Sequence, residues 1–262
     1  MKIQFHKYEG TGNDFILVDI RDSGWKPERE TIAFLCDRHF GIGADGLMLL
    51  SEAPGYDFRM TYYNSDGGES TMCGNGGRCM TAFADFLGLG SDRKKFIAID
   101  GEHVSRILQR IPGGMQITLR MKDVGHIEKM DGHYFINTGS PHYVVFANNV
   151  QGADVVREGR TIRYNDHFKE EGTNVDLVEV FPDHLFVRSY ERGVEDETLS
   201  CGTGVTASAI AAAMEDPGNP GFYRIRTTGG ELKVSFRQDR MNFSDIWLEG
   251  PVRAVFSGEI EG

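Results

Sequence analysis

Residues 69–76 read Glu-Ser-Thr-Met-Cys-Gly-Asn-Gly, and residues 197–204 read Glu-Thr-Leu-Ser-Cys-Gly-Thr-Gly. Both stretches share the pattern Glu-[Ser/Thr]-x-x-Cys-Gly-x-Gly, and each runs directly into a helix-like, largely apolar segment. The pattern occurs once in each half of the 262-residue chain. A motif duplicated at this spacing predicts two similar halves, which can bring the thiols of Cys73 and Cys201 to opposite sides of one carbon atom.

A second pair of segments repeats at nearly the same interval. Residues 11–13 read Thr-Gly-Asn and precede an apolar run at 15–18, whereas residues 138–140 read Thr-Gly-Ser and precede an apolar run at 142–145. Two independent repeats with one offset favour duplication of a whole domain over the chance recurrence of a short motif.

The pattern of apolar residues predicts the same elements in both halves. Alternating or continuous apolar runs predict strands at 1–9, 15–20, 47–51, 57–64, 96–100, 103–110 and 116–121, and again at 134–138, 142–147, 174–181, 185–190, 231–237 and 245–249. Helices are expected at 27–40, 74–87 and 205–214. In the first of these helices, Ile32, Phe34, Leu35 and Cys36 are expected to form a buried stripe.

The segment 205–214 has no charged face, and a helix that is apolar all round is normally buried. We therefore expect an α+β protein of two pseudo-symmetric halves, each an antiparallel β-rich, barrel-like sheet around a central helix. The expected halves are 1–125, which contains Cys73, and 126–262, which contains Cys201, with the last strand available to pair back onto the first half.

Composition excludes several classes of function. The net charge of −11 argues against nucleic acid or an anionic membrane as partner, because both attract basic surfaces. Neither a signal peptide nor a membrane-spanning run is recognisable, so a cytoplasmic protein is expected. In that reducing compartment four cysteines do not indicate disulfides, and their spacing does not suggest a metal site.

The position of each cysteine suggests its chemistry. A helix N-terminus favours an anion, which can be a thiolate or the carboxylate of a ligand that the flanking glycines allow to approach. Two thiols facing one carbon suit proton removal from one side and return from the other, with one thiolate as base and one thiol as acid. Which cysteine is the thiolate stays open. Because no dinucleotide fingerprint, P-loop or lysine motif is present, no cofactor is expected.

Other reactive or charged residues have simpler interpretations. Cys36 and Cys79 are expected to be small core residues on helices. The run Arg93-Lys94-Lys95 is expected to be a solvated loop, and His142 is a candidate site-lining residue.

Four blocks together resemble the diaminopimelate epimerases. They are Gly-Thr-Gly-Asn-Asp-Phe at 10–15, Arg-His-Phe-Gly-Ile-Gly-Ala-Asp-Gly at 38–46, the first cysteine block within 64–78, and the second cysteine block within 191–204. The resemblance implies cofactor-independent interconversion of L,L- and meso-diaminopimelate in lysine and peptidoglycan precursor biosynthesis. It also implies a fold of two pseudo-symmetric β-rich halves and a homodimer.

The resemblance assigns roles only to matching positions. Cys73 and Cys201 match the two catalytic residues, and Glu191 and Arg192 match the pair that recognises the distal ammonium and carboxylate of the substrate. The other matching positions are the substrate-binding asparagines and the residues whose backbone amides hold the reacting carboxylate: Asn13, Asn64 and Asn174, with Gly74, Asn75, Gly202 and Thr203.

One position departs from the family pattern, because Ser140 stands in Gly-Ser-Pro-His where the family has asparagine. The shorter side chain affects the expected grip on the substrate more than the expected reaction. Two alternatives remain: a cysteine-pair racemase acting on proline or hydroxyproline, and a non-epimerising isomerase or binder of the same fold. The first commonly has histidine at the position of Asn75, and the second generally lacks one or both cysteines.

Overall fold

The structure is a computed structural model that describes residues 2–261, and its chain contacts divide it into two units. The first unit comprises the chain up to Leu119 together with the segment from Gly250 onward, and the second comprises Arg120–Glu249. The boundary follows Leu119 rather than residue 125, and the segment after Glu249 packs with the first unit, as the expected pairing of the last strand back onto the first half allows.

Strand pairing closes the first unit into a barrel. Among residues 2–261, eight strands follow one another in the ring β1-β2-β3-β4-β6-β7-β8-β17, and β17 pairs back onto β1. Their bounds are β1 Lys2–Gly10, β2 Asn13–Asp19, β3 Gly46–Ser51, β4 Phe58–Asn64, β6 Arg93–Ala98, β7 Gly101–Ile111, β8 Gly114–Arg120 and β17 Asn242–Glu261. The short strand β5 (Glu69–Ser70) pairs with β4, and the helices are α1 (Arg29–Cys36) and α2 (Gly74–Phe86).

The second unit repeats this order of elements. Its strands follow one another as β9-β10-β11-β12-β13-β15-β16-β17, with β14 paired onto β13. Their bounds are β9 Ile127–Met130, β10 His133–Asn137, β11 Pro141–Phe146, β12 Asn174–Val180, β13 Leu185–Glu191, β14 Asp196–Thr198, β15 Phe222–Thr227 and β16 Gly230–Asp239. Its helices are η1 (Val150–Gly152), α3 (Val155–Arg163) and α4 (Gly202–Glu215). The predicted pseudo-symmetry is therefore confirmed.

Both sheets are mixed rather than purely antiparallel. β2 is parallel to β3 and β4 to β6, and correspondingly β11 is parallel to β12 and β13 to β15. Each parallel pair is separated in sequence by one α-helix, and the β11–β12 connection also contains η1, because parallel neighbours need a crossover connection. The expectation of antiparallel sheets was incomplete at these four places.

The last strand belongs to both units in turn. The first part of β17 pairs with β16, for example Val234 with Leu248, and the later part pairs with β8 and then with β1. The strand therefore completes the barrel of the first unit after leaving the second.

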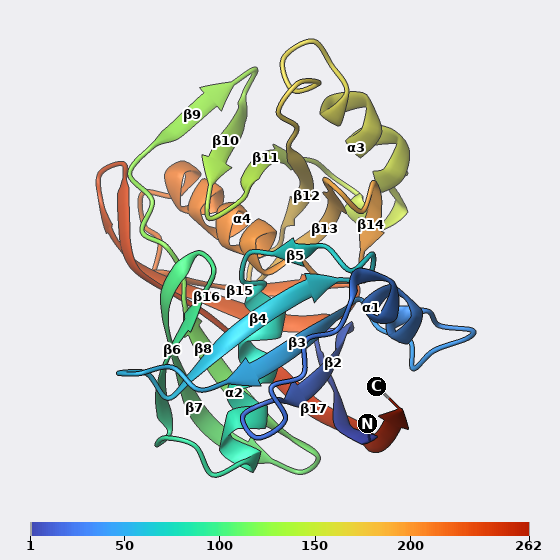
Figure 1. Cartoon of the computed structure of the whole chain (residues 1–262). Helices are drawn as coiled ribbons and strands as arrows, with labels where there is room; N and C mark the ends of the chain where they lie inside the picture. The colour runs from blue at the N-terminus through green and yellow to red at the C-terminus, as the bar shows by residue number, and fades with distance from the viewer. Residues whose placement is uncertain (1, 262) are drawn as a thin grey trace. The chain divides into compact units, whose positions relative to one another are not determined.

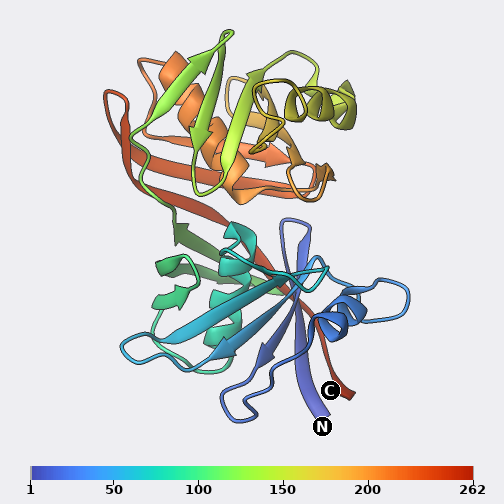
Figure 2. The same ribbon diagram turned by 45° about the horizontal axis from the view of Figure 1, so that its top comes forward.

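One helix lies at the centre of each unit (Figures 1 and 2). α2 contacts β1, β2, β3 and β7, and α4 contacts β10, β11, β12, β13, β15 and β16. α4 is buried along nearly its whole length, as its uncharged sequence predicts. None of the helices in the described range combines the length and the apolar character needed to cross a bilayer.

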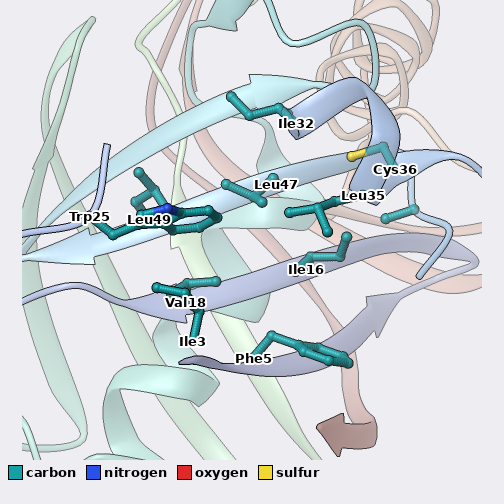
Figure 3. Close-up of a cluster of buried hydrophobic side chains, with 11 residues drawn as sticks. Ile3, Phe5, Ile16, Val18, Trp25, Ile32, Leu35, Cys36, Leu47 and Leu49 are labelled. Carbon is teal, nitrogen blue, oxygen red and sulfur yellow. The ribbon is translucent and has the colours of Figure 1, made fainter. Parts of the chain in front are cut away.

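An apolar cluster of the first unit lies between α1 and the neighbouring strands (Figure 3). Ile32, Leu35 and Cys36 of α1 lie over Leu47 of β3. A fully buried side chain of this size stabilises the fold by about 1.5–3 kcal/mol. Cys36 is thus a core residue, as expected.

The prediction for α1 was wrong at two points. The helix covers Arg29–Cys36 rather than 27–40, because the Asp37 N–H closes its last turn on the carbonyls of Ala33 and Phe34. Phe34 is 57% exposed instead of buried. Positions three and four apart share a helix face, so Ile32, Leu35 and Cys36 point inward together while Phe34 does not.

The expected solvated loop at residues 93–95 is instead the start of β6. The Lys94 side chain is fully buried, and its ammonium donates to the carbonyl oxygens of Leu89 at 2.7 Å and Ser91 at 2.9 Å, with Asp85 at 3.6 Å. Leu89 and Ser91 belong to the connection that follows α2, and Asp85 lies in the last turn of that helix. Lys94 therefore ties the connection after the central helix to β6.

Lys94→Met should lower the free energy of unfolding by about 1–3 kcal/mol, because it removes the donor from two part-buried carbonyl groups. The matched control is Lys95→Met, which removes a half-exposed lysine paired with Glu102 and should change stability by less than about 1 kcal/mol. Urea denaturation measures both. Equal effects of the two substitutions would contradict a structural role for Lys94.

Candidate functional site

Cys73 lies at the N-cap of α2, with extended backbone (φ −89°, ψ 132°). Its carbonyl oxygen accepts from the Gly77 N–H at 2.7 Å, which closes the first helical turn. A Cβ atom at Gly76 would lie 1.9 Å from Cε of Met48, so a glycine lets this turn pack directly on β3. The thiol thus stands at the positive end of a buried helix.

The Asn13 side chain faces Cys73 with a fixed orientation. Its Nδ2 donates to Oδ2 of Asp45 at 2.5 Å, which leaves Oδ1 toward the Cys73 Sγ at 3.6 Å and the Asn75 Nδ2 at 3.4 Å. Because Asp45 accepts hydrogen bonds when ionised, it determines which end of the Asn13 amide meets the thiol. The sequence motif singled out Asn13 but not Asp45 as part of this arrangement.

An ion cluster beneath Asn13 supports it. The Asp14 carboxylate accepts two hydrogen bonds from Arg38, at 2.8 and 3.0 Å, and forms an ion pair with the buried Lys7 at 2.7 Å. Burial alone would raise the pKa of Asp14, but the bonds from Arg38 and Lys7 outweigh it and lower this pKa from 3.8 to about 2. Arg38 also contacts Asp45 at 2.7 Å, so the cluster holds both carboxylates.

Arg78 places a buried positive charge on the helix that begins at Cys73. Its side chain is completely buried and donates to Oδ1 of Asn75 at 3.0 Å and to Oγ1 of Thr11 at 3.4 Å. Burial lowers the pKa of Arg78, and the nearby Cys73 acts in the opposite direction. Arginine nevertheless remains protonated in proteins, so its field favours negative charge at Cys73.

The other expected residues of the first unit are divided between surface and interior. Asn64 is exposed at the end of β4, where its backbone closes a turn with Gly67 and Gly68. Gly74 and Asn75 form the first turn of α2 and are buried. Their backbone amides are therefore at the helix N-terminus, while the Asn75 side chain contacts Asn13 and Arg78.

Cys201 occupies the matching position in the second unit, at the N-cap of α4 (φ −115°, ψ 114°). It is 7% exposed, and its Sγ lies 3.4 Å from Oγ1 of Thr203 in the first turn. The Thr203 carbonyl accepts from the Thr138 hydroxyl at 2.9 Å, which ties the helix start to the turn after β10. Gly202 is the first, buried residue of the helix.

His142 joins this helix start to two strands. Its Nε2 lies 2.9 Å from the Thr203 Oγ1, and its Nδ1 lies 2.7 Å from Oδ2 of Asp176. The Ser189 hydroxyl donates to the other Asp176 oxygen at 2.5 Å. A Cβ atom at Gly204 would lie 2.4 Å from the Asp176 carboxylate, so the last glycine of the motif makes room for this pair.

Asn174 is held by protein groups on all sides. Its Nδ2 donates to Oγ of Ser140 at 2.9 Å and to the Pro141 carbonyl at 3.0 Å, and its Oδ1 accepts from the Arg192 N–H at 2.8 Å. The side chain is 4% exposed. The serine that departs from the family pattern is thus a hydrogen-bond partner of Asn174.

Glu191 lies beside the second thiol. Its carboxylate accepts from the Thr198 hydroxyl at 2.5 Å and from Cys201. Burial raises the pKa of Glu191, and the bonds from Thr198 and Cys201 act against it. A role confined to the distal ammonium does not account for the contact with Cys201. Arg192 is exposed, and its guanidinium donates to the Glu171 carbonyl at 2.7 Å.

The two thiols therefore lie in opposite electrostatic surroundings. Burial raises the pKa of the Cys201 thiol well above its ordinary value, and negative charge at Glu191 and Asp176 raises it further. Cys73 instead has the buried Arg78 within electrostatic reach. In residues 2–261 no cluster of three or more His, Cys, Asp and Glu side chains is arranged as a metal site.

Sequence reasoning missed several residues of these half-sites: Asp45, Arg78, Asp176 and Ser189. Arg78 directly follows the first glycine-rich motif, and Asp176 lies two residues after Asn174, so proximity to a motif was the only available signal. Burial separates Arg78 and Asp176 from ordinary surface charges, since charged residues are almost never fully buried without a reason.

Comparison with known proteins identifies the family that this chain resembles. A family model described as diaminopimelate epimerase matches residues 5–129 and 134–255. A diaminopimelate epimerase of Flavobacterium psychrophilum is 48% identical over 261 residues, which cover 98% of this chain and all of the relative.

Among solved structures, a phenazine biosynthesis protein of the PhzF family from Bacillus anthracis superposes with a TM-score of 0.79 over the whole of both chains at 14% identity. A hydroxyproline epimerase from Agrobacterium vitis gives a TM-score of 0.69 at 14% identity, covering 99% of this chain and 92% of the other. These two likenesses show a shared two-domain fold.

The Asp14 cluster should make stability depend on pH in acid. The pKa of Asp14 is lower in the folded state, so its stabilising contribution is complete above about pH 3.8 and is lost as the pH falls toward 2. Asp14→Asn should remove on the order of 2 kcal/mol at neutral pH and flatten the decline of stability in that window.

Urea denaturation at a series of pH values measures this effect. The control is Asp166→Asn, whose carboxylate is fully exposed in its pair with Lys169 and should contribute less than about 1 kcal/mol. If Asp14→Asn keeps the acid dependence of the wild type, the cluster does not hold Asp14 ionised.

Proposed function

We propose, because this chain belongs to the diaminopimelate epimerase family, that it interconverts L,L- and meso-diaminopimelate. The family assignment makes the protein an isomerase. The observation that carries the proposal is the matching position of Cys73 and Cys201, each at the N-cap of the buried central helix of its unit.

The proposed reaction is a proton exchange at one carbon. A thiolate removes the α-hydrogen as a proton and becomes a thiol, and the electron pair of the broken C–H bond remains on the substrate. The opposite thiol then delivers its own proton to the other face and becomes a thiolate. The substrate is thereby inverted, and the two cysteines have exchanged protonation states.

The helix N-termini supply the stabilisation that this step requires. The amides of Gly74 and Asn75, and those of Gly202 and Thr203, are proposed to bind the carboxylate at the reacting carbon. Backbone N–H groups there are oriented in advance, so charge that develops on the carboxylate is stabilised without reorganisation.

We assign the starting states of the two thiols from their surroundings. Cys73 donates to Oδ1 of Asn13 in this structure, but the nearby Arg78 makes its ionisation easier, whereas burial and the neighbouring Glu191 and Asp176 favour the thiol of Cys201. When a substrate binds to the enzyme in these states, Cys73 removes the proton from the substrate and Cys201 returns one.

The remaining site residues are proposed to bind the two ends of the substrate. Glu191 contacts Cys201, which supports binding of the ammonium at the reacting end rather than the distal one. The exposed Arg192 is proposed to bind the distal carboxylate, with Asn64. Asn13 is proposed to contact the substrate beside Cys73.

Two further proposals are a homodimer, which the family resemblance implies, and the cytoplasmic location expected from the sequence. Sedimentation equilibrium of the purified protein tests the first, and cell fractionation tests the second. A monomer at micromolar concentration would overturn the dimer.

Cys73→Ala and Cys201→Ala should each reduce epimerisation by at least about 10²-fold, because each removes one of two essential proton-transfer groups. The Ser variants should retain partial function at most, since serine is a far weaker acid. Conversion of L,L- to meso-diaminopimelate and incorporation of solvent deuterium measure the loss. The control is Cys36→Ala, which removes a core thiol. Near wild-type turnover in Cys73→Ala or in Cys201→Ala would exclude the two-thiol mechanism.

Arg192→Lys should lower kcat/KM for diaminopimelate by at least about tenfold, because lysine cannot bind a carboxylate in the bidentate way that arginine does. The control is Arg237→Lys, which alters an 82% exposed side chain of the same unit and should leave kcat/KM unchanged. If Arg192→Lys has no effect while proline is racemised, the substrate class is the proline type instead.

A further inference from the structure

Glu195 lies in the turn that carries Arg192, and the proposed reaction does not use it. The turn connects β13 to β14, and the Glu195 N–H donates to the Glu191 carbonyl at 2.8 Å to close it. Glu195 has φ 60°, in the left-handed region that residues other than glycine rarely adopt. Such a conformation persists only where the surrounding structure holds it. The contacts of the Glu195 side chain supply that hold.

The Glu195 carboxylate joins the turn to two tyrosines. Its Oε2 accepts from the hydroxyl of Tyr164, the C-cap of α3, at 2.9 Å and from that of Tyr190 on β13 at 2.8 Å. Its Oε1 accepts from the Gly193 N–H at 3.1 Å. Each hydroxyl has one hydrogen and each carboxylate oxygen has two lone pairs, so all three bonds form at once. Burial would raise the pKa of Glu195, but these bonds and the nearby Arg163 outweigh it and lower this pKa, so the side chain is ionised at neutral pH.

Arg163, at the end of α3, is the cation that faces Glu195. Its Nε lies 3.7 Å from the Glu195 Oε1, and in residues 2–261 this buried Nε has no hydrogen-bond partner. Its Nη1 donates to the Phe168 carbonyl at 3.2 Å, and its guanidinium lies over the Tyr164 ring, 4.8 Å from the centroid. Arginine keeps its charge in proteins, and a mostly buried charge needs a partner. The Glu195 carboxylate supplies that partner.

The Arg192 side chain passes directly beside this cation. A Cβ atom at Gly172 would lie 2.6 Å from both the Arg163 Cζ and the Arg192 Cδ, so the glycine makes room for two arginines side by side. The Arg192 Nη1 donates to the Glu171 carbonyl at 2.7 Å. Two adjacent cations repel each other, and the Glu195 carboxylate reduces that repulsion by pairing with Arg163.

We propose that Glu195 is a positioning residue, which holds the turn after β13 and balances Arg163 so that the Arg192 guanidinium is ordered before the substrate binds. The inference rests on the proposed function, in which Arg192 binds the distal carboxylate of diaminopimelate. The bond to the Glu171 carbonyl uses one N–H group of Arg192 and leaves others for a carboxylate. An arginine that is already ordered loses less entropy on binding. Glu195 acts through Arg192 and does not contact the substrate.

The first test measures the order of the Arg192 side chain without turnover. Nitrogen-15 relaxation of arginine-labelled protein gives an order parameter for each Nε–H group, and the Arg192 signal is assigned by its loss in Arg192→Lys. Glu195→Gly removes the side chain without straining the turn, because glycine suits the positive φ. In this variant the Arg192 order parameter should fall below about 0.6, the range of flexible groups. An order parameter equal to that of the wild type would overturn the proposal.

Asp131→Gly is the matched control for this change. Asp131 is an exposed acidic residue with φ 51°, in the turn between β9 and β10 of the same unit. The substitution removes the same charge from the same backbone conformation, at a position outside the contacts of Arg163. It should leave the Arg192 order parameter and the KM for diaminopimelate unchanged. Equal effects of Asp131→Gly and Glu195→Gly would contradict the role of Glu195.

The second test separates KM from kcat for diaminopimelate. A contact made equally in the bound substrate and in the transition state affects KM and leaves kcat unchanged. Glu195→Gly should raise KM roughly three- to tenfold, the range expected when one long side chain must be ordered on binding. The value of kcat should change by less than about twofold. A fall in kcat with KM unchanged would indicate a general disturbance of the half-site around Cys201 and would overturn the proposal.

Glu195→Gln keeps the length of the side chain and removes its charge. Its NH2 group would face either the two tyrosine hydroxyls or the Gly193 N–H, all of which are donors. This variant should also raise KM, and it serves as the test if the glycine variant is unstable. An unchanged KM in Glu195→Gln would overturn the proposal, because Arg163 would then need no balancing charge.

A double-mutant cycle tests whether the effect passes through Arg192. In an Arg192→Ala background, Glu195→Gly should change KM by less than about twofold, because the side chain that it positions is absent. An equal rise of KM in the wild-type and Arg192→Ala backgrounds would overturn the proposal.

The two readouts separate this inference from the proposed function. Loss of Arg192 order in Glu195→Gly, together with a wild-type protein that does not convert diaminopimelate, would preserve the contacts of Glu195 and exclude the proposed function. Conversion of diaminopimelate by the wild type, together with unchanged Arg192 order and unchanged KM in Glu195→Gly, would preserve the function and exclude the positioning role.

Discussion

The start of a buried helix is the constraint on which both units depend. α2 and α4 lie among strands on several sides, so their first turns must approach neighbouring side chains closely. Glycine permits this approach at Gly76 against Met48 and at Gly204 against Asp176. The same turns leave backbone N–H groups pointing out of the helix end, next to a cysteine at the N-cap. Packing and chemistry therefore require the same short sequence.

Duplication of that helix start gives two similar thiols, and the surrounding side chains make them different. The first unit places the buried guanidinium of Arg78 on the helix of Cys73. The second unit places Asp176 and Glu191 near Cys201. A reaction that needs one base and one acid needs this inequality, because two thiols in identical surroundings would have the same tendency to ionise.

The sequence was sufficient to predict elements whose signals are local. The repeated cysteine motif predicted both central helices to within a few residues, and each repeat of the Thr-Gly turn preceded a predicted strand, which is β2 in the first unit and β11 in the second. The buried character of α4 followed from its lack of charge. Cys36 and Cys79 are buried on helices, as their apolar neighbours indicated.

Features that depend on distant partners could not be predicted in this way. Lys94 is buried because the connection after α2 supplies carbonyl acceptors, which its run of three basic residues does not reveal. Asp176 was missed because its partner His142 is on another strand, and only their pairing distinguishes it from an ordinary strand residue.

The central claim is that the two half-sites give their thiols different tendencies to ionise. It is tested most directly by alkylating the ligand-free wild-type protein across a range of pH and quantifying the Cys73 and Cys201 peptides from the same samples. The account predicts that Cys73 reacts with a midpoint at lower pH than Cys201, because Arg78 favours its thiolate while burial and nearby carboxylates disfavour that of Cys201. Equal midpoints, or a lower midpoint for Cys201, would contradict it.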